Sequence, residues 1–227
     1  SGNVLNRAVV VLSVLAAMTG LYGLGLGKLF PRETEWTRAA RRLVPGMIGL
    51  SAVSLVFILG SEVAEWNLEG KVSMGEAAIA AVSAALLGLA TVSLTCAVVP
   101  GRDPLGLSER GRTAYVYAAE VLLALLFMHI RLTKPEWFLG FFARYWTIIV
   151  MLLAFLGAGL SELFQRQKRL VLAEPLERTG ALLPLLPVLS LWISPSDVHY
   201  SLLLIVVGMF YGALSVARKS FGFGLLA

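Results

Sequence analysis

The chain has 227 residues, of which 58% are hydrophobic and 15% are charged. A soluble globular domain carries about 25% charged residues, so this composition excludes soluble globular folds, and it excludes disordered and collagen-like chains as well. The formal net charge is +5. In a multi-spanning membrane protein such an excess is typical of basic inner loops that meet anionic lipid headgroups, and we expect no nucleic-acid partner.

Seven runs of the sequence are apolar and nearly free of charge. Each is close to the roughly 20 residues that a helix needs to cross a hydrocarbon core of about 30 Å. The predicted spans are residues 8–27, 43–61, 77–101, 113–130, 139–161, 179–196 and 198–217. Strands of a membrane barrel would be about 10 residues long and would alternate in polarity. The pattern therefore predicts an all-α integral membrane protein, a single bundle of seven transmembrane helices over residues 1–227.

The basic residues of the connecting segments predict the orientation. The first, third and fifth loops and the C-terminal tail carry 14 of the 19 Lys and Arg residues, whereas the N-terminal tail and the other loops carry 5. Short loops rich in Lys and Arg lie on the cytoplasmic side of a membrane. We therefore expect the N-terminus outside, the C-terminus inside, and integration into a bacterial cytoplasmic membrane.

The first loop combines Trp36 with Arg38, Arg41 and Arg42. This pattern is typical of a short helix that lies on the inner leaflet and contacts anionic lipid headgroups. A solvated basic loop is the alternative.

The second loop, residues 62–76, holds four glutamates and one lysine. We interpret it as an acidic outer loop, because the predicted orientation alone accounts for its charge. A cation site is the alternative.

Glu120 lies near the middle of the predicted fourth span. A charged residue there costs about 2.5–3.5 kcal/mol on the insertion scale, which the surrounding apolar residues offset. Such a residue faces the bundle interior or a wet cavity, and Tyr117 lies on the same helix face. We interpret Glu120, together with Tyr117, as a candidate proton or ion relay. The alternative is a hydrogen-bonded glutamate that ties helices together.

The two histidines, His129 and His199, fall near the predicted outer ends of spans, and we interpret them as interfacial side chains. His129 lies nine positions after Glu120, on the opposite face of the helix, so the two do not form a pair within it. Two axial histidines can hold a haem, so a haem-binding redox subunit at His129 and His199 is a further alternative. We otherwise expect no cofactor, and no residue cluster has the spacing of a metal site.

Pro184 and Pro187 predict a kinked or broken sixth helix. Broken helices line the binding sites of transporters, although proline is common in membrane helices in general. The sequence contains no G-x-S-x-G, H-E-x-x-H or P-loop motif, which favours a protein that is not an enzyme.

A new apolar run follows Arg218 and ends at Ala227. It is typical of the start of an eighth span, so we expect the chain to be a piece of a longer polytopic protein. The strings Leu172–Pro187, Ser196–Leu204 and Ser220–Leu226 resemble segments of long, multi-spanning bacterial membrane proteins of no assigned activity. The resemblance covers about residues 110–227, and it implies a multi-spanning fold but no catalytic residue or cofactor.

These patterns lead to two main functional predictions. The first is a non-enzymatic multi-pass membrane module, a structural or assembly part of a larger membrane protein. The second is a proton- or ion-coupled secondary transporter or channel that uses Glu120.

Overall fold

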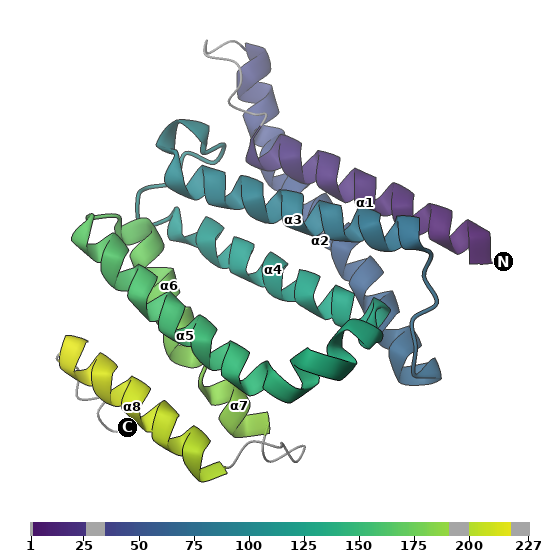
Figure 1. The fold of residues 1–227 in the computed structure, drawn as a ribbon. Helices are drawn as coiled ribbons and strands as arrows, with labels where there is room; N and C mark the ends of the chain where they lie inside the picture. Colours follow the sequence, from purple (N-terminus) through teal and green to yellow (C-terminus); the bar gives the residue numbers. More distant parts are fainter. Residues whose placement is uncertain (1, 26–34, 191–199, 219–227) are drawn as a thin grey trace. The chain divides into compact units, whose positions relative to one another are not determined.

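The computed structural model describes residues 2–25, 35–190 and 200–218 (Figure 1). The regular elements in these ranges are helices. They are α1 (Gly2–Leu24), α2 (Glu35–Glu69), α3 (Glu76–Val98), η2 (Pro100–Arg102), α4 (Thr113–Thr133), η3 (Pro135–Trp137), η4 (Phe138–Phe142), α5 (Ala143–Arg166), α6 (Leu170–Leu182), α7 (Leu185–Ser190) and α8 (Tyr200–Arg218).

Six of these helices, α1 to α5 and α8, are long and apolar enough to cross a membrane. This confirms the all-helical class and supports a membrane protein. The predicted sixth span, residues 179–196, is not among them, because its described residues are divided between α6, α7 and the turn that separates them. The seven-span count and the orientation therefore stay predictions.

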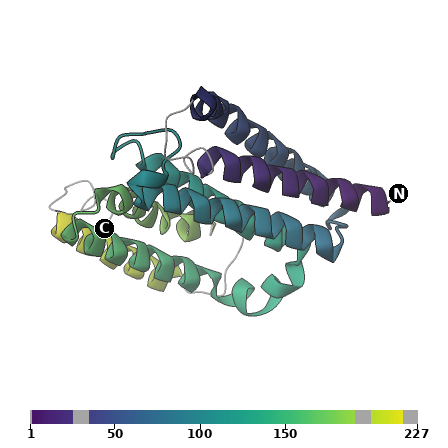
Figure 2. The same ribbon diagram turned by 90° about the horizontal axis from the view of Figure 1, so that it is seen from above.

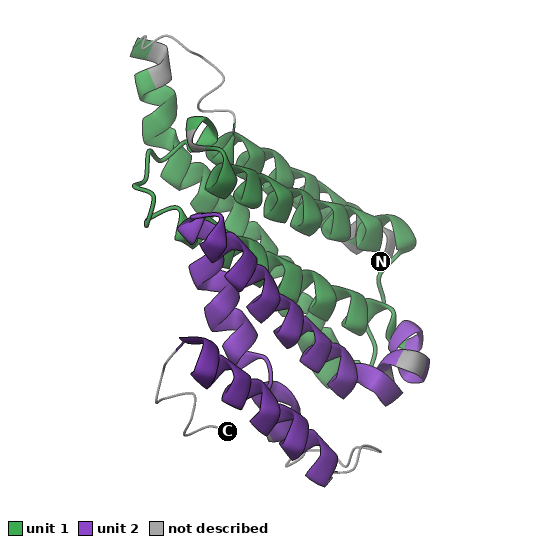
Figure 3. Ribbon diagram, turned by 60° about the vertical axis from the view of Figure 1, so that its left-hand side comes forward, with its two compact units in different colours: residues 1–135 green, residues 136–227 purple. Residues whose placement is uncertain are grey.

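The chain divides into two compact units, residues 1–135 and 136–227 (Figure 3). In the first unit, α1 packs against α2 and α3, α3 packs against α4, and α2 also meets α4 (Figures 1 and 2). Small and aliphatic side chains form its core, among them Ala16, Ile58, Val82, Leu86 and Ala119.

Glycines let α1 approach its neighbours closely. A Cβ atom at Gly20 would lie 2.1 Å from Leu89 Cδ2, and one at Gly23 would lie 2.8 Å from Ile48 Cγ1. At this short separation Ser51 Oγ on α2 donates a hydrogen bond to the carbonyl oxygen of Ala16 on α1, at 2.7 Å. Small residues at the interface therefore allow close backbone packing, as in membrane helix pairs generally.

Helix α2 is longer than the predicted second span at both ends. Its 35 residues include Trp36, Arg38, Arg41 and Arg42 of the predicted interfacial helix and the first half of the predicted acidic loop, which are therefore continuous with it. The helix continues past Glu62 because no helix-breaking residue interrupts it before Gly70. Gly70 has a φ of +69°, and its N–H donates to the Trp66 carbonyl oxygen at 2.9 Å, which is a glycine-terminated helix end.

A buried aspartate organises the loop between α3 and α4. The Asp103 carboxylate accepts hydrogen bonds from the Leu105 N–H at 2.9 Å, from the Leu107 N–H, and from the Tyr115 hydroxyl at 2.7 Å. Arg112 adds a hydrogen bond from its guanidinium to the Ala97 carbonyl oxygen, at 2.9 Å. This end of the first unit is therefore held by side chains that satisfy loop and helix-end backbone groups.

In the second unit, α5 packs against α6 around two facing glycines. A Cβ atom at Gly180 would lie 3.2 Å from the Ala158 backbone nitrogen, and one at Gly157 would lie 3.3 Å from Gly180 Cα. Phe210 on α8 is buried and makes an edge-on contact with Phe155, with ring centroids 4.9 Å apart. Backbone packing and an aromatic cluster therefore hold this unit together.

Candidate functional site

Three glutamates lie on one face of the C-terminal part of α2. Glu62, Glu65 and Glu69 are three and four residues apart, a spacing that places them on the same side of a helix. The sequence interpretation placed them in a loop, which was wrong because α2 runs on to Glu69. The helix therefore aligns three carboxylates that a loop would have dispersed.

Glu62 forms a buried pair with His129 of α4. The Nδ1 atom of His129 lies 2.9 Å from each of the two carboxylate oxygens of Glu62. The side chains are 1% and 0% exposed, respectively. The interpretation of His129 as an interfacial side chain was therefore wrong, because α2 and α3 cover the imidazole.

The second ring nitrogen of His129 contacts a third helix. Its Nε2 atom lies 3.2 Å from the carbonyl oxygen of Ile79, which is in the first turns of α3. A carbonyl oxygen can only accept, so Nε2 is the donor in this contact. One imidazole thus joins α2, α3 and α4.

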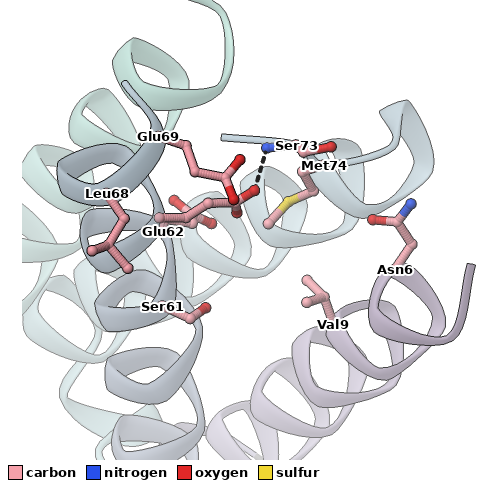
Figure 4. A pocket seen from close by; sticks show the side chains of 9 residues that line it. Asn6, Val9, Ser61, Glu62, Leu68, Glu69, Ser73 and Met74 are labelled. Carbon is pink, nitrogen blue, oxygen red and sulfur yellow. Dashed lines mark hydrogen bonds between the residues drawn. The ribbon is translucent and has the colours of Figure 1, made fainter. Parts of the chain in front are cut away.

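Glu62 also lines a pocket of about 370 Å³ at this end of the first unit (Figure 4). The volume lies within the range of ligand-binding clefts. One side of the pocket is formed by carboxylates of α2 together with Ser73 and Met74, which precede α3. Asn6 and Val9 of α1 lie across from them. The lining residues are Asn6, Val9, Ser61, Glu62, Glu65, Leu68, Glu69, Ser73 and Met74.

Two hydrogen bonds hold the segment that leads from α2 into α3. The Ser73 N–H donates to Oε1 of Glu65 at 2.8 Å, and the Gly75 N–H donates to Oδ1 of Asn6 at 3.1 Å. Lys134, just after α4, forms an ion pair with Glu76 at the start of α3. The pocket wall is therefore held by polar contacts to α1, α2 and the end of α4.

The relay residues predicted on α4 lie elsewhere. Glu120 and Tyr117 are half-buried on α4 and do not line the pocket. As expected from their spacing, Glu120 and His129 do not pair with each other; His129 pairs with Glu62. A relay at Glu120 stays a prediction.

The remaining predicted residues fall in three places. Arg38, Arg41 and Arg42 are exposed near the start of α2, and Arg38 pairs with Glu35 at 3.0 Å. Trp36 belongs to α2, but its side chain is not among those described. The helix is interrupted between Leu182 and Leu185, and Pro184 and Pro187 are both buried.

The haem prediction remains open because His199 lies outside the described residues. Both ring nitrogens of His129 contact groups of this chain. Within residues 2–25, 35–190 and 200–218, no three His, Cys, Asp or Glu side chains come together in a way that could hold a metal ion.

The second unit contains a polar cluster that the sequence analysis missed. The Arg218 guanidinium on α8 lies 3.2 Å from Glu177 Oε1 on α6 and 3.5 Å from Glu162 Oε2 on α5, and it also bonds Gln165 and Ser161 of α5. The sequence analysis counted Arg218 in the C-terminal tail, whereas the structure has it as the last residue of α8. The cluster joins three helices and is best explained as a structural tie.

Comparison with known protein families, curated proteins and solved structures gives no match to this chain.

Proposed function

We propose that this chain is a multi-pass protein of a bacterial cytoplasmic membrane that takes up and releases a proton at the Glu62–His129 pair, as the proton-coupling part of a transporter or channel. One observation carries the proposal. A fully buried carboxylate and imidazole face each other within helices long enough to span, and the carboxylate also lines a pocket. Ionisable residues are costly in a membrane, and they mark proton and ion pathways.

The pair suits proton exchange better than Glu120 does. It combines an acid and a base in direct contact, and histidine is the side chain whose protonation changes most readily near neutral pH. Glu62 also lines the pocket, although its side chain is only 1% exposed. Glu120 does not line this pocket, so we propose it only as a second relay position.

A structural or assembly module is the second candidate function. His129 contacts α2 through Glu62 and α3 through Ile79, so the pair also ties three helices together. In this case the pair would hold its protons permanently, and its loss would affect folding alone.

The proposed placement has the N-terminus outside and the C-terminus inside. Arg38, Arg41 and Arg42 are exposed at the start of α2, where they would contact anionic headgroups of the inner leaflet. The pocket, at the other end of α2, would then open toward the outside. Compartment-dependent reporters fused to each end test this, and inside signals from both ends would contradict it.

Proton flux into vesicles tests the proposed function. The full chain is reconstituted with a pH-sensitive dye inside, and an imposed pH gradient drives the flux. Glu62→Gln is expected to lower the flux by at least about tenfold, since a proton-transfer group contributes on the order of 100-fold or more to a rate. Glu109→Gln, which neutralises an exposed carboxylate in the loop before α4, is the matched control and should leave the flux unchanged.

The alternatives give different results in the same assay. No flux through the wild type would refute the proposal. If the Glu62→Gln variant conducts protons as fast as the wild type but unfolds more easily, the result would support the structural module. If Glu120→Gln loses the flux and Glu62→Gln does not, the result would support Glu120 as the proton relay.

A further inference from the structure

The contacts of His129 determine how many protons the Glu62–His129 pair holds. Nε2 carries a hydrogen, because it donates to the Ile79 carbonyl oxygen at 3.2 Å. Nδ1 lies 2.9 Å from both Glu62 oxygens, so a second proton stands between the ring and the carboxyl group, on one or the other. In either arrangement the pair holds two protons and has no net charge.

Removal of one proton breaks one of these two contacts. The pair then consists of a neutral imidazole and an ionised Glu62, so only one ring nitrogen can donate. A hydrogen bond to a carboxylate is about twice as strong as one to a neutral acceptor, so the remaining proton stays on Nδ1. Nε2 then presents a lone pair to the lone pairs of the Ile79 oxygen, and this contact is lost.

We propose that loss of this proton frees the Ile79 carbonyl oxygen from His129 and loosens the pocket wall that precedes α3, which then keeps only its contacts to Glu65, Asn6 and Lys134. The inference rests on the proposed function, because it requires the pair to exchange a proton. The Ile79 N–H donates to the Gly75 carbonyl oxygen at 3.0 Å, so the two residues move as one helix turn. Ser73 and Met74, directly before that turn, line the pocket.

The sign of the pH dependence follows from the same contacts. Raising the pH removes the proton and opens the wall. Lowering the pH adds a third proton to the pair. The His129 imidazolium then donates from Nδ1 to the carbonyl oxygen of the protonated Glu62 and from Nε2 to the Ile79 carbonyl oxygen, so the wall stays closed. The pocket is therefore expected to open at high pH and to remain closed in acid.

Other charged groups surround the pair. Glu65 and Glu69 of α2 line the same pocket. Glu76 of α3 forms an ion pair with Lys134, next to α4. Helix α1 contributes Asn6 and Val9 to the lining, neither of which titrates. Because Glu62 is the carboxylate in contact with the imidazole, a substitution there separates the titration of the pair from that of its neighbours.

Nitrogen NMR of the full chain in lipid nanodiscs tests the proton count. The sequence has two histidines, so His199→Gln leaves His129 as the reporter. As the pH rises, Nε2 should lose its hydrogen, and after the loss Nδ1 should carry the one that remains. In the further variant Glu62→Gln, the amide donates to Nδ1, so Nε2 should keep its hydrogen at every pH.

Thiol labelling tests the opening of the wall. Met74→Cys reports on the pocket, and Asn67→Cys, on an exposed position of α2, corrects for the ionisation of the thiol itself. The native Cys96 is buried, so the parent chain gives the background. As the pair loses its proton, the ratio of the Met74→Cys labelling rate to the Asn67→Cys labelling rate should rise about two- to tenfold. This factor corresponds to the free energy of one lost hydrogen bond.

The controls and outcomes separate this inference from the proposed function. The rise should disappear in Glu62→Gln and persist in Glu109→Gln. Loss of the Nδ1 hydrogen instead of the Nε2 hydrogen, or a constant labelling ratio while the ring titrates, would overturn the inference and leave proton exchange intact. Ring hydrogens on His129 that do not change at any pH at which the chain stays folded would overturn both.

Discussion

The buried pair predicts a strongly non-additive effect of substitutions on stability. His129→Leu leaves the Glu62 carboxylate, 1% exposed, without its imidazole. Breaking a buried charged pair by removing one partner costs about 3–5 kcal/mol. Glu62→Leu leaves a neutral imidazole that keeps its contact with Ile79, so its cost is smaller, about 1–3 kcal/mol.

The double variant Glu62→Leu, His129→Leu should be close to the wild type, because apolar residues of similar volume replace a buried pair with little net loss. Reversible unfolding in mixed micelles, followed by circular dichroism, measures all three free energies. Glu65→Leu, one turn along α2, loses a single exposed hydrogen bond and should cost about 0.5–1.5 kcal/mol. If the two single effects add to the double effect within about 0.5 kcal/mol, Glu62 and His129 do not interact as described.

Three further predictions concern the packing of each unit, and the same unfolding measurement checks them. Gly180→Leu should cost at least about 1–3 kcal/mol because the backbone of α5 lies within contact of any added side chain, whereas Gly159→Leu has open space and should be nearly neutral. Asp103→Ala should cost about 1.5–3 kcal/mol, since it leaves a buried tyrosine hydroxyl and two loop N–H groups without their acceptor. Arg218→Ala should destabilise the second unit far more than Arg166→Ala, whose ion pair is exposed and is worth about 0–1 kcal/mol. Equal effects within either matched pair would contradict the packing described.

Hydropathy predicted the class of fold and the position of most helices, because apolar length is a property of the sequence itself. It did not predict how far α2 extends, because the charges at Arg42 and Glu62 mark the ends of an apolar run and not the ends of the helix. In the structure α2 ends at Glu69, directly before Gly70, whose backbone adopts a left-handed conformation, and a carboxylate at Glu62 does not interrupt a helix. The predicted sixth span was also divided differently, since the turn before Leu185 interrupts it.

Only part of the candidate site could be predicted from the sequence. The helical spacing of Glu62, Glu65 and Glu69 was visible and would have extended α2 over all three. The pairing of Glu62 with His129 could not be predicted from the sequence. The two residues are 67 positions apart in the chain, and their contact depends on how α2 and α4 pack together. The relay was predicted at Glu120 because this residue interrupts an apolar run. Glu62 lies at the end of an apolar run, so its charge was interpreted as part of a loop.

The length of α2 makes the Glu62–His129 pair sensitive to the thickness of the bilayer in the proposed placement. The uncharged stretch 43–61 covers about 28 Å, close to the 30 Å of a typical hydrocarbon core, so Glu62 lies at its boundary. Hydrophobic mismatch costs a fraction of a kcal/mol per Å, and lipids with longer chains would draw the pair into hydrocarbon. Proton release should then weaken as acyl chains lengthen, and a flux that is independent of chain length would place the pair away from that boundary.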